Sequence, residues 1–148
     1  MKRILFVCHG NICRSPMAEF TLKRMVRQAG REKEFEIASA ATSTEELGKP
    51  VYPMARQELA KHGIGCPGHQ ARQLTPDDYQ RFDLIVGMDR DNIEQATRIL
   101  QGDPDGKVRF LLPDREVADP WYTRDFRTAW LDINEGCQAL LDNMQPND

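Results

Sequence analysis

The chain has 148 residues, of which 40% are hydrophobic and 29% charged, with a formal net charge of -3 at pH 7. These values fit one globular domain with a sizeable core, so we expect residues 1–148 to form a single domain. The acidic balance argues against a broad binding surface for nucleic acid or for an anionic membrane. The apolar run behind Lys2 and Arg3 is too short for a signal peptide or a membrane span, which predicts a cytoplasmic protein.

Apolar runs alternate along the chain with stretches in which apolar residues recur at helical spacing. The runs expected to form buried strands are 3–8, 35–40, 83–88 and 107–112. The stretches expected to form helices are 16–29, 53–62, a short one beginning near 75–78, 89–100 and 125–144. This alternation predicts an α/β fold, a three-layer sandwich with a four-stranded parallel sheet flanked by helices.

Residues at the ends of the predicted helices support these assignments. Ser15 is a favourable N-cap for the first helix, Pro16 suits its first position, and Gly30 suits the residue after its end. The segment 75–78 has the composition of a capping box, and Asp89 can cap the helix that follows the third strand. We therefore expect well-marked helix boundaries.

The turn "CHGNICRSP", residues 8–16, leads from the first strand directly into a helix N-terminus, where unpaired N–H groups favour an anion. Gly10 and Asn11 tolerate left-handed geometry, so the turn can direct several N–H groups inward. Arg14 adds a planar fork that can hold two oxygens. The lysine and the distant second glycine of a nucleotide-binding P-loop are missing, so we expect a seat for a single phosphoryl group.

Cys8 stands at the start of this turn, where everything that favours an anion also favours a thiolate. Ser15 would donate a further hydrogen bond to the sulfur. A thiolate beneath a bound phosphate is a nucleophile in line with phosphorus, and its attack would form a cysteinyl-phosphate. The alternative is a structural cysteine at a strand end with Arg14 nearby by chance. The strand-turn-helix setting favours the catalytic interpretation.

Asp119 is the candidate for the acid that the leaving group needs. It precedes Pro120 in the loop between the fourth strand and the last helix, at the same sheet edge as Cys8 if all strands are parallel. Asp119 would protonate the leaving oxygen and then activate water. An Asp-Pro pair standing alone is more often an ordinary turn. Trp121 and Tyr122 would wall a slot for an aromatic ring or pack into the core.

The sequence contains four cysteines in a chain without a secretion signal, which predicts reduced thiols rather than a disulfide framework. They are Cys8, Cys13, Cys66 and Cys137. Their spacing with histidines does not suggest zinc. We therefore expect neither a metal ion nor another cofactor.

"VCHGNICRSPMAE" together with "ADPWY" resembles the low-molecular-weight protein tyrosine phosphatases. The resemblance extends to "SAAT", "KHGI", "HQARQL", "FDLIVGMDRDN" and the long C-terminal helix, so it covers essentially the whole chain. It implies a phosphatase I-like fold and a metal-independent protein tyrosine phosphatase. Such an enzyme acts on phosphotyrosine in proteins and on aryl phosphates, and releases inorganic phosphate. The resemblance implies Cys8 as the nucleophile, Arg14 as the phosphate clamp and Asp119 as the general acid and base.

The resemblance also implies supporting roles. The residues it places around the substrate are His9, Gly10, Asn11, Ile12, Cys13, Ser15, Trp121 and Tyr122. Asn11 and Ser15 would organise the loop and the thiolate, and His69 would hydrogen-bond the phosphate loop as a structural partner. Cys13 would lie near enough to Cys8 for a reversible disulfide under peroxide, although a small loop residue is an equally good interpretation.

Two departures from the family pattern concern the substrate pocket. Members often have "SAGT" followed by a tryptophan, whereas this chain has Ala41 and then Glu45 and Glu46. An aromatic wall is therefore expected to be missing. If the loop borders the site, these carboxylates would repel acidic peptides or attract basic ones, but a solvated loop face is the more common explanation. Tyr52, at a commonly acidic position, would supply the missing ring from another point.

Three alternatives remain from the sequence. An arsenate reductase of the same fold needs two further cysteines in the region after the third strand, and the segment "GMDRDNIEQATRIL", residues 87–100, contains none. A protein-arginine phosphatase would have a small polar residue in place of Ile12, whose bulk favours a tyrosyl ester. A non-catalytic phosphate-binding or thiol-redox module would not need Cys8, Arg14 and Asp119 together.

Overall fold

The computed structural model describes residues 1–144 and contains the four expected strands. They are β1 (Lys2–Cys8), β2 (Phe35–Ala41), β3 (Leu84–Gly87) and β4 (Val108–Phe110). The helices are α1 (Arg14–Gln28), the short 3-10 helix η1 (Glu32–Glu34), α2 (Pro53–Lys61), α3 (Asp78–Arg81), α4 (Arg90–Leu100), α5 (Pro120–Thr123) and α6 (Phe126–Asp142). None of the helices within residues 1–144 is long and apolar enough to cross a membrane.

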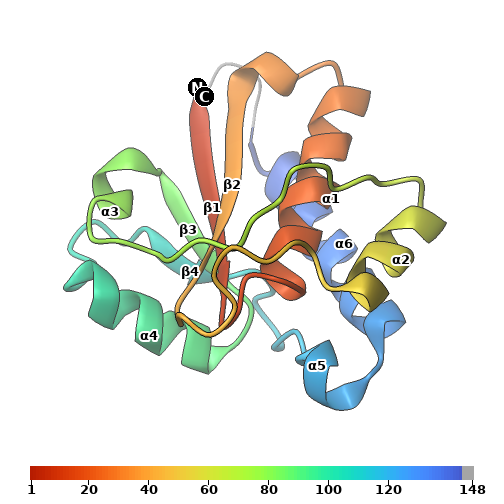
Figure 1. Ribbon diagram of the computed structural model, residues 1–148. Helices are drawn as coiled ribbons and strands as arrows, with labels where there is room; N and C mark the ends of the chain where they lie inside the picture. Colours follow the sequence, from red (N-terminus) through yellow and green to blue (C-terminus); the bar gives the residue numbers. More distant parts are fainter. Residues whose placement is uncertain (145–148) are drawn as a thin grey trace.

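The strands form one parallel sheet in the order β2-β1-β3-β4. Helices α1, α2 and α6 lie on one side of it and α3 and α4 on the other, so the predicted three-layer sandwich is confirmed (Figure 1). Strand β1 is an inner strand of the sheet. The next strand, β2, pairs with one edge of β1, and β3 then pairs with the other edge. Parallel sheets bind ligands at the carboxyl end of such a switch in strand order. Cys8 ends β1 at that point.

Strand β1 is buried on both faces, as the continuous apolar run predicts. Ile4 and Phe6 belong to the core that includes α1 and α6. Leu5 and Val7 point the other way, into the core beneath α4. All four side chains are fully buried, so the strand that carries Cys8 is held from both sides.

The first helix ends as predicted but begins differently. Gly30 adopts φ 69°, in the left-handed region. The N–H of Arg31 donates to the carbonyl of Val26 at 2.8 Å, and this hydrogen bond closes the last turn of the helix. The prediction that Ser15 is the N-cap is wrong, because α1 begins at Arg14 and Cys13 is the capping residue. The Ser15 hydroxyl is not available as a cap, since it contacts the side chains of the preceding turn.

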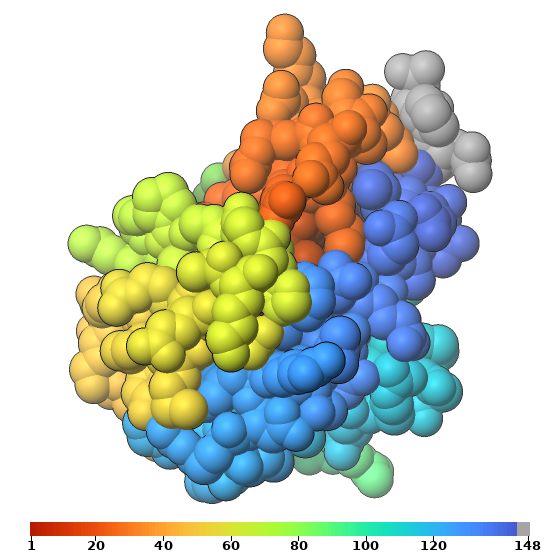
Figure 2. Space-filling model, turned by 90° about the vertical axis from the view of Figure 1, so that its right-hand side faces the viewer, coloured from red at the N-terminus to blue at the C-terminus, as the bar shows by residue number. Residues whose placement is uncertain are grey.

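Helix α5 is one turn that the sequence pattern does not predict, because four residues are too few to show a periodicity. Pro120 occupies its first position, and the Asp119 carboxylate caps it by accepting a hydrogen bond from the Trp121 N–H at 3.0 Å. On the face shown in Figure 2, the blue segment with α5 and α6 lies beside the yellow segment with α2. The candidate acid therefore caps a short helix, and this helix belongs to the segment that lies beside α2.

Candidate active site

Cys8 lies at the floor of the turn that joins β1 to α1, with 3% of its surface exposed. Its Sγ lies 3.0 Å from Oγ of Ser15 and accepts a hydrogen bond from the Ser15 backbone N–H at 3.4 Å. That N–H belongs to the first turn of α1, so the sulfur faces the positive end of the helix dipole. Hydrogen-bond donors and a helix N-terminus are thus directed at the sulfur.

Five carbonyl groups of the turn are directed away from its centre. They accept hydrogen bonds from neighbouring segments: Cys8 from Thr42, His9 from Ser43, Asn11 from His69, Ile12 from Tyr52, and Cys13 from Met17. When successive carbonyl groups face outward, the N–H groups of the same turn are free to converge on an anion. The turn therefore has the geometry of the phosphoryl seat that the sequence predicts.

Asn11 is the buried centre of this turn, with no exposed surface and φ 59°. Its Nδ2 donates to Oγ of Ser15 at 2.8 Å and to Oγ of Ser39 at 2.9 Å, and its Oδ1 accepts from the Arg72 N–H at 3.2 Å. The His69 ring holds the Asn11 carbonyl at 2.7 Å. Asn11 thus joins the turn to β2 and to the segment before α3, and its amide also orients the hydroxyl that contacts Cys8.

Arg14 is almost fully buried, with 3% of its side chain exposed, and three acceptors hold its guanidinium. Nη1 donates to Oδ2 of Asp89 at 2.7 Å and to the Val117 carbonyl at 2.8 Å, and Nη2 donates to Oδ2 of Asp119 at 3.4 Å. Burial alone would lower the pKa of Arg14, but the negative charges of Cys8, Asp119 and Asp89 raise it. The guanidinium therefore stays cationic at the rim of the seat.

The sequence pattern indicates Asp89 only as the cap of α4, but its carboxylate makes two different contacts. Oδ1 accepts from the Asn92 N–H at 2.8 Å, which confirms the cap, while Oδ2 holds Arg14. The pairing escapes sequence inspection because the two residues are 75 positions apart. Only the parallel order of β1 and β3 brings them together.

The candidate catalytic residues line a pocket of about 130 Å³ above the turn. Its walls are formed by Cys8, His9, Gly10, Ile12, Cys13, Arg14, Glu45, Glu46, Asp119, Trp121 and Tyr122. Asn11 and Ser15, expected around the substrate, have no exposed surface and lie beneath the turn, outside this lining. His69 also lies outside it and contacts the turn from behind. The side chains of these three residues therefore support the seat.

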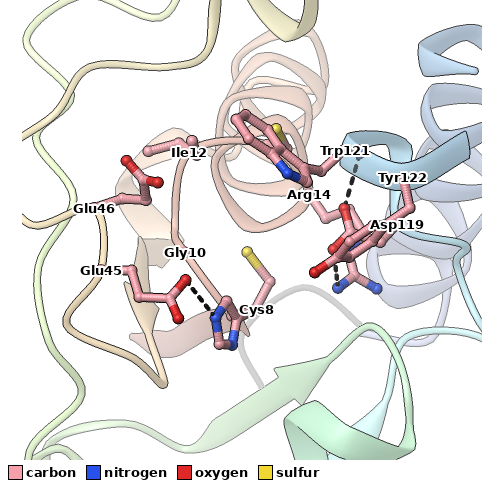
Figure 3. Close-up of a pocket in the computed structure, with 11 residues that line it drawn as sticks. Cys8, Gly10, Ile12, Arg14, Glu45, Glu46, Asp119, Trp121 and Tyr122 are labelled. Carbon is pink, nitrogen blue, oxygen red and sulfur yellow. Dashed lines mark hydrogen bonds and ion pairs between the residues drawn. The ribbon is translucent and has the colours of Figure 1, made fainter. Parts of the chain in front are cut away.

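The mouth of the pocket has an acidic side and an aromatic side (Figure 3). Glu45 and Glu46 form the first, with Glu45 Oε2 2.9 Å from Nε2 of His9. Trp121 and Tyr122 form the second and are 42% and 80% exposed, so they are not core residues. The loop with the two glutamates therefore borders the site, and aromatic side chains wall it from the α5 side.

Tyr52 does not line the pocket, so the expectation that it supplies the missing ring there is wrong. Its ring stands behind Trp121, with centroids 5.0 Å apart and planes inclined at 65°. The aromatic wall is thus two rings deep, and Tyr52 supports it from the α2 side.

All four cysteines are free, and Cys13 lies beside Cys8 in the pocket wall. Burial, followed by the negative charges of Cys8 and Asp119, raises the pKa of Cys13 to about 12. Cys13 therefore stays a neutral thiol near pH 7, whereas Cys8 faces the helix N-terminus. Within residues 1–144, no group of three or more His, Cys, Asp or Glu side chains is placed to hold a metal ion.

Comparisons with known proteins agree with this geometry. The family model described as low molecular weight phosphotyrosine protein phosphatase matches residues 3–148. A low molecular weight phosphotyrosine protein phosphatase of Gallus gallus is 38% identical over 151 residues, covering 96% of this chain and 95% of that protein.

Two solved structures are similar along their whole length. YfkJ of Bacillus subtilis superposes with a TM-score of 0.92 at 33% identity, covering 96% of this chain and 93% of that one. The low molecular weight protein tyrosine phosphatase SP-PTP of Streptococcus pyogenes gives 0.91 at 36% identity, covering 99% and 95%. The chain belongs to the low molecular weight phosphotyrosine protein phosphatase family.

Proposed function

We propose that this protein hydrolyses phosphotyrosine in proteins through a cysteinyl-phosphate on Cys8. The observation that carries the proposal is the position of the Cys8 sulfur. It lies at the floor of a pocket, against the N-terminus of α1, with the buried cation of Arg14 and the carboxylate of Asp119 in the same pocket. Membership of the phosphatase family supports the same reaction.

The first step transfers the phosphoryl group to the enzyme. The Cys8 thiolate attacks phosphorus and forms an S–P bond, while the P–O bond to the tyrosine ring breaks and its electron pair goes to the phenolic oxygen. Asp119 donates a proton to that oxygen. Inward N–H groups and Arg14 hold the three equatorial oxygens as their charge develops.

The second step releases inorganic phosphate. Asp119, now a carboxylate, takes a proton from a water molecule as the water oxygen attacks phosphorus. The S–P bond breaks, its electron pair returns to Cys8, and the Asp119 carboxyl is again protonated for the next turnover. The hydroxyl and N–H of Ser15, next to the sulfur, stabilise the departing thiolate.

The shape of the pocket favours an aryl ester. Ile12 presents an apolar side chain on one side and Trp121 and Tyr122 present rings on the other, so a flat ring fits between them. A phosphoguanidinium would bring its charge onto the side chain of Ile12, which argues against the arginine phosphatase alternative. The two cysteines that an arsenate reductase needs directly after β3 are missing, because residues 87–100 contain no cysteine.

Turnover of p-nitrophenyl phosphate in the presence of EDTA tests the proposal. Cys8→Ser should abolish activity, whereas the matched change Cys66→Ser, outside the pocket lining, should leave it intact. Phosphotyrosine, phosphoarginine and arsenate given to the same preparation separate the three related activities. An active Cys8→Ser protein, or loss of activity in EDTA, would contradict the reaction as proposed.

We also propose that Glu45 favours basic residues beside the phosphotyrosine. Its side chain is 66% exposed at the mouth, and its partner His9 can be replaced by a substrate lysine or arginine. The test compares phosphotyrosine peptides with Lys or Glu next to the tyrosine. Glu45→Gln should reduce the preference for Lys. The control Glu32→Gln changes an exposed residue before β2, at the opposite edge of the sheet, and should leave the preference unchanged. A preference that is equal in both variants would refute this role.

Three expectations stay predictions: the single domain over 1–148, the cytoplasmic location, and the reversible Cys8–Cys13 disulfide. The disulfide has a direct test. Peroxide should inactivate the wild-type enzyme reversibly, with a thiol reductant restoring activity, while Cys13→Ser should be inactivated without recovery. Equal recovery in both proteins would exclude a protective role for Cys13.

A further inference from the structure

Arg124 follows α5 and is held by contacts that the proposed reaction does not use. Nη2 donates to the Tyr52 hydroxyl at 2.9 Å, and Nη1 donates to the Trp121 carbonyl at 3.2 Å. The guanidinium carbon lies 5.5 Å from the ring centroid of Tyr52, 5.9 Å from that of Trp121 and 5.7 Å from that of Phe126. One cation is therefore packed among three rings from α5, α6 and the residue before α2.

The backbone of Arg124 ties this cation to the candidate acid. The residue has φ 62°, in the left-handed region, and its N–H donates to the Pro120 carbonyl at 2.9 Å. At the other end of the same turn, the Asp119 carboxylate accepts from the Trp121 N–H at 3.0 Å. The segment 119–124 is thus one hydrogen-bonded turn with Asp119 at its start and Arg124 at its end.

Tyr52 ties the same cation to the phosphate seat. Its backbone N–H donates to the Ile12 carbonyl at 2.8 Å, within the turn that begins at Cys8. Its ring packs on Trp121, and its hydroxyl receives Arg124. A continuous path of contacts therefore runs from the nucleophile turn through Tyr52 and Arg124 to the α5 turn with Asp119.

We propose that Arg124 is a positioning residue, which sets the place of Asp119 over the leaving oxygen by clamping α5 against Tyr52. The inference rests on the proposed phosphatase reaction and adds a residue outside the pocket lining. Asp119 has one other side-chain anchor in the site, the 3.4 Å hydrogen bond from Arg14. Without the contacts of Arg124, Asp119 keeps its hydrogen bond to Arg14, but α5 can move relative to Tyr52. Because proton transfer depends steeply on the position of the acid, this movement should slow the protonation of the leaving oxygen.

The substitution Arg124→Gly isolates the side chain, because glycine adopts the left-handed conformation without strain and keeps the turn. The readout is kcat/KM for phenyl phosphate, whose leaving group needs a proton, against p-nitrophenyl phosphate, whose leaving group needs it far less. We expect kcat/KM to fall about tenfold for phenyl phosphate and less than about threefold for p-nitrophenyl phosphate. The loss for phenyl phosphate is smaller than the full contribution of a general acid, because Asp119 is still present. A purely structural loss would lower both equally.

Two further variants test which atoms matter. Arg124→Lys keeps the charge but loses the planar fork, and should behave nearly as Arg124→Gly does. Tyr52→Phe keeps the ring and removes only the hydroxyl that receives Arg124, and should shift the substrate ratio in the same direction by less. Arg127→Gln is the matched control at an exposed position in the first turn of α6, and should leave the ratio unchanged.

A double substitution tests whether Arg124 acts through Asp119. Asp119→Asn removes the acid and keeps an oxygen for the Trp121 N–H. In that background Arg124→Gly should have no further effect on the substrate ratio, because the group that it positions is gone. A ratio that still changes, or a single variant that lowers both substrates alike, would overturn the clamp. A wild-type protein without phosphatase activity would instead refute the proposed function itself.

Discussion

Replacing Asn11 tests most sharply how the phosphate seat is held together. The side chain is fully buried and makes three hydrogen bonds, at 2.8, 2.9 and 3.2 Å, to Ser15, Ser39 and Arg72. Asn11→Gly removes these bonds and keeps a residue that accepts φ 59°. Asn11→Ala removes the same bonds and also places a Cβ in the left-handed region. Comparing the two separates hydrogen bonding from backbone strain.

The magnitudes follow from these contacts. Each buried hydrogen bond contributes about 1 kcal/mol net, so Asn11→Gly should lower the free energy of unfolding by about 3 kcal/mol. The left-handed conformation costs an alanine about 1 kcal/mol more than it costs asparagine or glycine, so Asn11→Ala should lose about 4 kcal/mol. These losses are a large fraction of the stability of a typical domain, about 5–15 kcal/mol.

Urea unfolding measured by circular dichroism gives both free energies, and turnover of p-nitrophenyl phosphate gives the activity of the folded protein. Because the Asn11 amide also orients the Ser15 hydroxyl at Cys8, kcat should fall in both variants under conditions where they are fully folded. A loss below about 1 kcal/mol in both variants would refute the hydrogen-bond argument. Equal stability of the two would refute the backbone argument.

Three further predictions concern packing, pH and thiol chemistry. A Cβ at Gly136 would collide with the side chain of Leu111. Gly136→Ala should therefore lower the free energy of unfolding by about 1–3 kcal/mol, and an unchanged urea midpoint would contradict this. Burial would raise the pKa of Asp103, but hydrogen bonds from a tyrosine hydroxyl and backbone N–H groups lower it overall. The ionised Asp103 carboxylate therefore stabilises the folded protein above the ordinary Asp pKa, and this stabilisation is lost as the pH falls. The difference in unfolding free energy between the wild type and Asp103→Asn should shrink below about pH 4. A difference that stays constant with pH would contradict the lowered pKa. At about pH 7.5, iodoacetamide should modify Cys8 before Cys13, whose pKa of about 12 keeps it protonated; peptide mass spectrometry that finds Cys13 modified first would contradict this.

Local signals made the fold and the centre of the site predictable. The apolar run of β1 and the periodicity of α1 set a strand and a helix on either side of the turn, so an anion seat between them followed from general physics. Cys8, Arg14 and Asp119 could be named in advance for the same reason. Each stands beside a recognisable boundary, either a strand end, a helix start or an Asp-Pro pair.

The supporting contacts of the site were not predictable, because they join distant parts of the chain. Arg14 meets Asp89 only through the pairing of β1 with β3, and the acidic loop meets the pocket only through the pairing of β1 with β2. The Ser15 hydroxyl serves Cys8 instead of a helix cap because Asn11 turns it inward. The position of Tyr52 behind Trp121 depends on how α2 packs, which no local pattern specifies.

The most direct test of the account is detection of phosphate on Cys8 during turnover. Asp119→Asn should still accept a phosphoryl group from p-nitrophenyl phosphate but should release it slowly, because the base that activates water is missing. Acid quenching followed by peptide mass spectrometry should then find one phosphoryl group on the peptide with Cys8, and none in the Cys8→Ser protein. Phosphate on another residue, or steady turnover with no enzyme-bound phosphate, would contradict the mechanism.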